Sequence, residues 1–124
     1  MEKNFTFQFD SSLGIFFKYY FGPITLEDIG DSWEYVIENH LIPEGTKGFV
    51  LDYRNAVMNI LPDKHPRIAD FYKNNLDLYG NKKIAILTDN PHNVVISILV
   101  ESKDEGYHSK PFSTMEAAIQ WVLS

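Results

Sequence analysis

The chain of 124 residues contains no cysteine. This absence excludes disulfide bonds, thiolate metal sites and cysteine nucleophiles. It also favours a reducing compartment, and we expect the protein to be cytoplasmic. Long apolar runs are missing as well, because none approaches the roughly 20 residues that a membrane-spanning helix requires. The sequence therefore predicts no integral membrane segment.

Basic residues are scarce relative to acidic ones. The 11 Lys and Arg residues stand against 17 Asp and Glu residues, which gives a formal net charge of −6. Proteins that bind nucleic acids neutralise phosphate groups with clusters of Lys and Arg. The balance of charge therefore argues against nucleic acid as a partner.

Recognisable catalytic motifs are also lacking. The sequence has no Gly-x-Ser-x-Gly nucleophile elbow, no His-Glu-x-x-His zinc motif and no glycine-rich phosphate loop. Its four histidines, at positions 40, 65, 92 and 108, do not have the i,i+4 spacing of a helical metal site. We therefore predict no catalytic residues, no metal site and no cofactor, and we expect that the protein is not an enzyme.

What is present is an alternation of strand and helix patterns. Residues 5–9 alternate apolar and polar side chains, and residues 15–21 are rich in β-branched and aromatic side chains, so both segments predict strands. The sequence Asp10-Ser11-Ser12-Leu13-Gly14 between them favours a tight hairpin turn. Short apolar runs at 48–53 and 83–88 predict buried parallel strands, and residues 107–112 predict an edge strand.

Apolar residues at helical spacing predict four helices, over residues 26–41, 68–79, 91–99 and 115–123. The resulting order predicts an α/β fold, in which an N-terminal β-hairpin is followed by alternating helices and strands in a mixed, mostly parallel sheet. No linker or internal repeat interrupts this order, so we expect a single domain that spans residues 1–124.

Capping residues mark the starts of three of these helices. Thr25 and Asp28 have the spacing of a capping box, and Ser113 and Glu116 repeat it before the last helix. Asn90 precedes a proline, the pairing that is typical of an N-cap followed by the first helical position.

Three stretches of the sequence resemble the STAS domain superfamily. They are GFVLDYR at residues 48–54, KIAILTD at 83–89 and FSTMEAAIQW at 112–121. Within that superfamily the chain is similar to small stand-alone proteins described as SpoIIAA-like, which are relatives of the anti-sigma-factor antagonists. The resemblance covers nearly the whole chain and implies a STAS fold that binds a protein partner.

Regulatory STAS domains carry Asp-Ser-Ser/Thr-Gly after their central strand, where the serine is phosphorylated. Residues 52–62 occupy that place in this chain and contain neither serine nor threonine. The resemblance therefore implies a module without the usual phospho-acceptor. The similar triplet Asp10-Ser11-Ser12 falls in the predicted hairpin, and we interpret it as part of the turn.

Polar residues gather where two of the predicted strands end. Ligands of parallel sheets usually lie beyond the carboxyl ends of the strands. In a functional interpretation, Arg54 contacts a carboxylate or another anion. In a structural interpretation, Arg54 pairs with Asp52 or Asp89, and Asn90 caps a helix. The candidate binding residues are Asp52, Tyr53, Arg54, Asn55, Asp89, Asn90 and His92.

The first predicted helix is a second candidate site, because residues 25–44 contain six acids and no Lys or Arg. Glu34 and Glu38 are four residues apart, so their charges repel each other on one helix face. These two residues form a candidate docking face for a basic partner, which the charge would attract. The alternative is an acidic face that contacts only solvent.

The hairpin is the third feature, because eight of the 18 aromatic residues lie between positions 5 and 21. Helices on both sides of the sheet would bury these rings in the core. Alternatively, Phe16 and Tyr20 lie on an exposed apolar face that serves self-association or binds an apolar small molecule or lipid.

Two functions follow from these features. The leading prediction is a non-catalytic protein-interaction module, with regulation as one use of the binding, whose ligand is a protein partner or a second copy of the chain. The runner-up is a small carrier of an apolar ligand or lipid, which uses the aromatic hairpin side of the sheet.

Overall fold

The computed structural model describes residues 4–124, which form five strands, five α-helices and one 3-10 turn. In chain order the elements are β1 (Phe5–Asp10), β2 (Ile15–Ile24), α1 (Leu26–Glu38), β3 (Gly48–Met58), η1 (Pro62–Lys64), α2 (His65–Lys73), α3 (Leu76–Tyr79), β4 (Lys83–Leu87), α4 (Pro91–Glu101), β5 (His108–Phe112) and α5 (Met115–Leu123).

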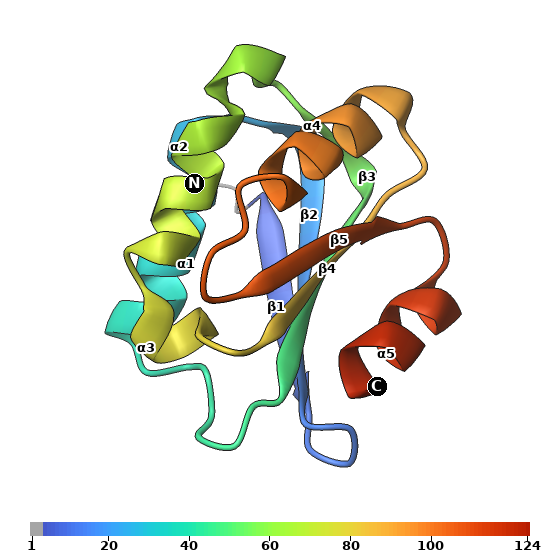
Figure 1. Cartoon of the computed structure of the whole chain (residues 1–124). Coiled ribbons are helices and arrows are strands. Elements are labelled where there is room, and N and C mark those ends of the chain that lie inside the picture. The colour runs from blue at the N-terminus through green and yellow to red at the C-terminus, as the bar shows by residue number, and fades with distance from the viewer. Residues whose placement is uncertain (1–3) are drawn as a thin grey trace.

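The strands form one sheet in the order β1-β2-β3-β4-β5. β1 pairs antiparallel with β2, whereas the pairs β2–β3, β3–β4 and β4–β5 are all parallel. Helices make the crossovers between the parallel strands (Figure 1). The predicted α/β fold, with its N-terminal hairpin and its mixed, mostly parallel sheet, is confirmed.

Helices cover both faces of the sheet (Figure 1). α1 to α4 lie on one face, over the larger hydrophobic core. In that core the buried Trp33 ring is edge-on to the rings of Phe49 and Tyr79, at centroid distances of 5.8 and 5.3 Å. On the other face, α5 is the one described helix, and Val122 packs there in a smaller core with Val50.

The Asp10-Ser11-Ser12 triplet forms the hairpin turn, as the sequence predicts. A carboxylate oxygen of Asp10 accepts hydrogen bonds from the Ser12 amide (2.9 Å), the Ser12 hydroxyl (2.6 Å) and the Leu13 amide (3.0 Å). Gly14 then takes a φ of 71°, a left-handed conformation that side chains disfavour. The turn therefore accounts for the acid, the second serine and the glycine.

The predicted aromatic hairpin is also a core element. Phe16 and Tyr20 are 0% and 1% exposed under the helices of the larger core, so the prediction that they form an exposed apolar face is wrong. On the other face, Ile15 and Phe17 pack in the smaller core. Residues 21–23 of β2 are exposed, with Phe21 at 42%, before Ile24 is buried again at its end.

Two of the three predicted helix caps are present. The Thr25 hydroxyl accepts from the Asp28 amide and the Asp28 carboxylate accepts from the Thr25 amide, so the capping box of α1 is confirmed. Asn90 caps α4 as predicted. The box predicted for α5 is wrong, because its cap is Thr114, whose hydroxyl accepts from the Ala117 amide.

The two largest differences from the predicted elements are a helix break and a longer strand. The helix expected over 68–79 is interrupted, since α2 ends at Lys73 and α3 begins at Leu76. The Asn75 side chain donates to the Phe71 carbonyl (2.7 Å), a local bond by which Asn competes with helix continuation. β3 continues to Met58, past a register shift opposite the 19–21 segment of β2.

Within residues 4–124, none of the helices has both the length and the apolar composition needed to cross a membrane.

Candidate functional site

The seven polar residues predicted around the strand ends do not form one cluster. Because β3 continues to Met58, residues 52–55 lie within the strand and not beyond its end. Strand alternation turns Tyr53 to the opposite face from Asp52. There Tyr53 is 2% exposed, and its ring stacks on that of Tyr20 at a centroid distance of 4.4 Å. The prediction that Tyr53 belongs to a recognition surface is therefore wrong.

Arg54 and Asp52 form a close ion pair. The Arg54 guanidinium donates from Nη2 to Asp52 Oδ2 (2.8 Å) and from Nε to Oδ1 (3.1 Å), and the Arg54 amide also donates to Oδ1 (3.0 Å). This hydrogen bonding to Asp52 raises the pKa of Arg54 further, with a smaller contribution from the charge of Asp89. The structural interpretation of Arg54 is therefore confirmed, whereas Asn55 lies exposed beside the pair.

Asn90 and His92 hold α4 against the end of β3. Asn90 accepts from the Asn93 amide as the N-cap. His92 Nε2 lies 2.9 Å from the Met58 carbonyl oxygen and 3.1 Å from that of Ile60. Both side chains therefore have structural partners, and Asp89 between the strand and the helix is exposed.

Asn93 is a structural residue that the sequence analysis missed. Its fully buried amide accepts from the Met58 amide (2.8 Å) and donates to the Ala56 carbonyl (3.0 Å) and the Thr88 hydroxyl (3.1 Å). It thereby joins α4 to β3 and to the residue after β4. The signal was its spacing, because Asn93 shares the buried face of α4 with Ile96 and Val100.

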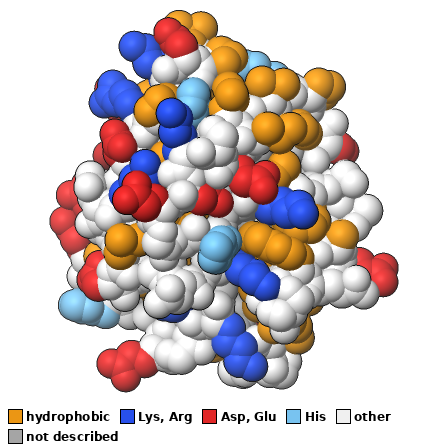
Figure 2. Space-filling model, viewed as in Figure 1, with side chains coloured by type: hydrophobic (Ala, Val, Ile, Leu, Met, Phe, Trp, Pro, Cys, Tyr) orange, Lys and Arg blue, Asp and Glu red, His pale blue; other side chains and the backbone are white. Residues whose placement is uncertain are grey.

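Glu34 and Glu38 lie on the exposed side of α1, as predicted. A hydrogen bond to Glu38 and the repulsion of its charge raise the pKa of Glu34, and Asp31 contributes a further repulsion. Figure 2 shows acidic side chains along the left margin of the molecule, the side on which α1 and α3 lie in Figure 1. The carboxylates of Asp31 and Glu38 thus lie close enough to Glu34 to destabilise its charge.

A groove separates α1 from the α2–α3 segment. It consists of two hollows of about 470 and 400 Å³, which share Ile37 and Asn75 in their linings. Among the described residues that line them, none is Lys or Arg. We call these two hollows together the acidic groove, after the acids in their linings: Glu27, Asp31, Glu34, Glu38, Glu44 and Asp77.

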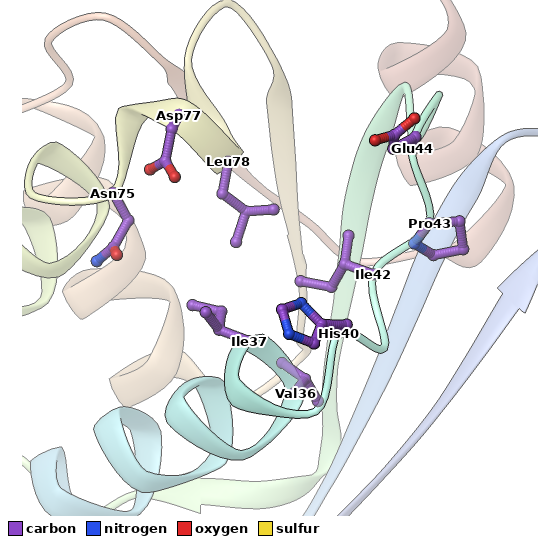
Figure 3. A pocket seen from close by; sticks show the side chains of 9 residues that line it. All are labelled: Val36, Ile37, His40, Ile42, Pro43, Glu44, Asn75, Asp77 and Leu78. Carbon is purple, nitrogen blue, oxygen red and sulfur yellow. The ribbon is translucent and has the colours of Figure 1, made fainter.

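The floor of the acidic groove is apolar. Ile37 and Phe71 line the first hollow and are only partly buried against the larger core. In the second hollow, the side chains of Ile37, Ile42 and Leu78 point toward one another, and the carboxylates of Asp77 and Glu44 lie on different sides of it (Figure 3). The groove therefore combines an apolar floor with a negatively charged rim.

Lys18 is a buried lysine to which the sequence analysis assigns no role. Its side chain is fully buried; Nζ donates to the Ser32 hydroxyl (2.5 Å) and lies 3.7 Å from the centroid of the Trp33 ring. Burial lowers the pKa of Lys18 well below its ordinary value. Its position between Phe16 and Tyr20 on one strand face was the signal that this lysine enters the core.

Within the described range, no group of three or more His, Asp or Glu side chains is arranged to hold a metal ion. No protein-family model matches the sequence, and no curated protein matches it significantly.

One solved structure is similar to the chain over nearly its whole length. It is the crystal structure of an uncharacterised protein of the DUF3478 family from Shewanella loihica PV-4, described as having a SpoIIAA-like fold. The match covers 98% of this chain and 96% of that protein, with a TM-score of 0.66 and 14% sequence identity. The chain has a SpoIIAA-like fold. The resemblance inferred from three sequence stretches is thus confirmed for the fold, which is all that a likeness at this identity establishes.

Proposed function

We propose that this SpoIIAA-like chain is a non-catalytic protein-interaction module that binds a basic partner on the acidic side of α1. The observation that carries this proposal is the acidic groove, which has acids along its rim, no Lys or Arg in its described lining and an apolar floor. Complementary charge steers a partner toward such a surface, and apolar contact retains it there.

The energetics of α1 support a role in binding. Like charges four residues apart on a helix destabilise it. Glu34 and Glu38 are such a pair, and a hydrogen bond to Glu38 together with the repulsion of its charge raises the pKa of Glu34. A cationic partner relieves this repulsion, so the acids that weaken the free helix strengthen the complex.

The region where regulatory STAS domains are phosphorylated supports a module that works without that switch. In this chain the region is the second half of β3 and the turn after it, and residues 52–62 offer no hydroxyl side chain except that of Tyr53. The Tyr53 ring is buried against Tyr20. Regulation, if the partner exerts any, therefore acts through binding and not through a phosphate at this position.

The carrier function has less support. The cavity between the sheet and α2 and α4, which includes Tyr53 and Tyr72 in its lining, has a volume of about 10 Å³. That volume holds about one water molecule. The hairpin aromatics that were to form the carrier surface, Phe16 and Tyr20, are packed in the core.

Charge reversal tests the proposed function. The wild-type protein, Glu34→Lys/Glu38→Lys and the control Glu101→Lys/Glu105→Lys are immobilised and exposed to an extract of the source cells. The control changes the net charge equally, but on α4 and the loop after it. We expect the wild-type protein and the control to retain a basic protein from the extract. The α1 variant should retain at least about tenfold less of that protein. Equal retention by all three proteins, or no retained protein, contradicts the proposal.

A further inference from the structure

Gly30 has no structural reason to be glycine in the free chain. It lies in the middle of α1, where glycine lowers helix stability relative to alanine. A Cβ atom built on Gly30 meets no atom within 4 Å, so no neighbouring group excludes a side chain. By contrast, a Cβ on Gly48 would collide with Val122 on α5.

The position of Gly30 points outward into the acidic groove. The residue lines the first hollow together with Asp31 and Glu34, and it also lines an adjoining hollow with Phe71 and with Arg67, the one described basic residue in that lining. A glycine at the surface of a groove allows the backbone of a bound chain to approach closely. The missing side chain therefore leaves space where an occupant would lie against α1.

The dimensions of the groove fit a helix. α1 has 13 residues and is therefore about 20 Å long, the length of three to four helical turns. The apolar side chains along the groove, Ile37, Phe71 and Leu78, match the single apolar stripe of an amphipathic helix. Helix-in-groove recognition uses such a stripe, with apolar anchors at i, i+3 or i+4, and i+7.

The charges of the groove determine the sign of the occupant. Six acids line it, and its described lining contains one histidine, His40, and no Lys or Arg. Asp77 and Glu44 lie around the second hollow (Figure 3). Glu34 and Glu38 line the first. An occupant with Lys or Arg on both sides of its apolar stripe would meet carboxylates along the whole groove.

We propose that the acidic groove between α1 and the α2–α3 segment receives a cationic amphipathic α-helix of a partner protein, which crosses α1 at Gly30. This inference rests on the proposed function and specifies the partner and its geometry. The apolar stripe of the bound helix lies on Ile37, Phe71 and Leu78, and its Lys and Arg side chains pair with the acids of the rim.

The test uses two labelled peptides of about 14 residues, roughly four helical turns. Both contain only Lys and Leu in the same proportion; one has Leu at helical spacing on one face, and the other has the same residues in a shuffled order. Fluorescence anisotropy measures binding to the wild-type protein, Gly30→Ala, Gly30→Leu, Glu34→Lys/Glu38→Lys and a control. The control is Gln120→Leu, at an exposed position on α5.

We expect the amphipathic peptide to bind at least tenfold more tightly than the shuffled one. Gly30→Leu weakens its binding at least tenfold and Gly30→Ala severalfold, whereas Gln120→Leu leaves it unchanged. Because a side chain at Gly30 is tolerated in the free chain, Gly30→Ala also raises the melting temperature by about 2–6 °C. A loss of binding in a more stable variant cannot be ascribed to unfolding.

Equal affinity for both peptides, or undiminished binding to Gly30→Leu, overturns the helix proposal. If Glu34→Lys/Glu38→Lys still abolishes binding in that case, the proposed function stands and only the helix in the groove is rejected. If neither peptide binds to the wild-type protein, the helix proposal is also overturned, and the extract experiment decides the proposed function independently.

Discussion

Two basic side chains on neighbouring strands of the sheet are accommodated in opposite ways. Lys18 on β2 faces the larger core, is fully buried and has a hydroxyl and aromatic rings around its amine. Arg54 on β3 has a side chain that is 43% exposed and pairs with Asp52. Among the described ion pairs, none involves Lys18.

The chemistry of the two side chains explains the difference. An amine can lose its proton when burial removes its hydration, and the lowered pKa of Lys18 records this preference. A guanidinium keeps its charge under all ordinary conditions, so Arg54 needs a carboxylate when its environment is partly buried. The Ser32 hydroxyl accepts a hydrogen bond from the Lys18 amine. The same hydroxyl donates to the Ile29 carbonyl (2.8 Å) and lies 3.2 Å from the Tyr20 hydroxyl.

Removing the ring beside Lys18 is expected to have the largest effect. Trp33→Ala deletes a fully buried side chain and leaves the Lys18 amine over a cavity, so we expect it to lower the free energy of unfolding by about 3–5 kcal/mol. Urea unfolding measures this loss. The control is Trp121→Ala on α5, where the ring is only half-buried beside Lys83. Equal losses in the two variants would show that Trp33 has no special place in the core.

Replacing the amine tests whether Lys18 is held uncharged. The folded pKa of Lys18 is lowered and the unfolded value is about 10.5, so between these values the unfolded chain binds one more proton. Stability of the wild type therefore rises with pH in this interval, by up to about 1.4 kcal/mol per pH unit. Lys18→Met removes this rise, so we expect the variant to be the more stable protein at neutral pH and its advantage to shrink toward pH 9.5.

Unfolding in urea at several pH values between 7 and 9.5 checks this prediction. The range ends at pH 9.5 because tyrosines ionise in the unfolded chain above it. The pKa values of the buried Tyr53, Tyr72 and Tyr79 are raised in the fold, so their ionisation makes stability fall as pH rises further. The exposed Lys110→Met is the matched control, since it removes a lysine without changing the core. A parallel pH dependence in Lys18→Met and wild type would mean that Lys18 is charged in the fold.

The contrast between the two basic side chains also shows what sequence alone could predict. Alternation along β2 places Lys18 on one face with Phe16 and Tyr20, but whether that face is covered depends on how α1, the next element in the chain, folds back onto it. The Asp52–Arg54 pair was predictable because residues two apart share a strand face. The same alternation could have excluded Tyr53 from the site.

Local chemistry predicted more than packing did. The hairpin turn and the caps at Thr25 and Asn90 depend on residues within three positions of one another, and the structure confirms them. The acidic groove depends on the separation of α1 from α2, which no short sequence pattern encodes. Five of its six acids lie in the acidic segment 25–44 that the sequence analysis identified, whereas Asp77 and the apolar floor were not identified.

Removing the exposed cation, Arg54, is expected to have the smallest effect on the free energy of unfolding. Arg54→Met leaves the Asp52 carboxylate with one hydrogen bond, from the backbone amide of residue 54, and its side chain is only 7% exposed. We expect a loss of about 1 kcal/mol in the free energy of unfolding at low salt. Solvent screening of this accessible pair limits the loss, whereas the Asp52 carboxylate left without its charged partner increases it. In 1 M NaCl the difference from wild type should shrink, because salt already weakens the native pair.

Lys73→Met is the matched control for this last prediction. Lys73 Nζ lies 3.9 Å from Glu105 Oε2, and the Glu105 side chain is 83% exposed, so its loss leaves no buried charge behind. We therefore expect less than about 0.5 kcal/mol from Lys73→Met at either salt concentration. If Arg54→Met has an equally small effect, the buried carboxylate of Asp52 does not need its partner, and burial alone does not distinguish the two basic side chains. A salt-dependent loss confined to Arg54→Met would instead show that the buried carboxylate of Asp52 needs the permanent charge of Arg54 beside it.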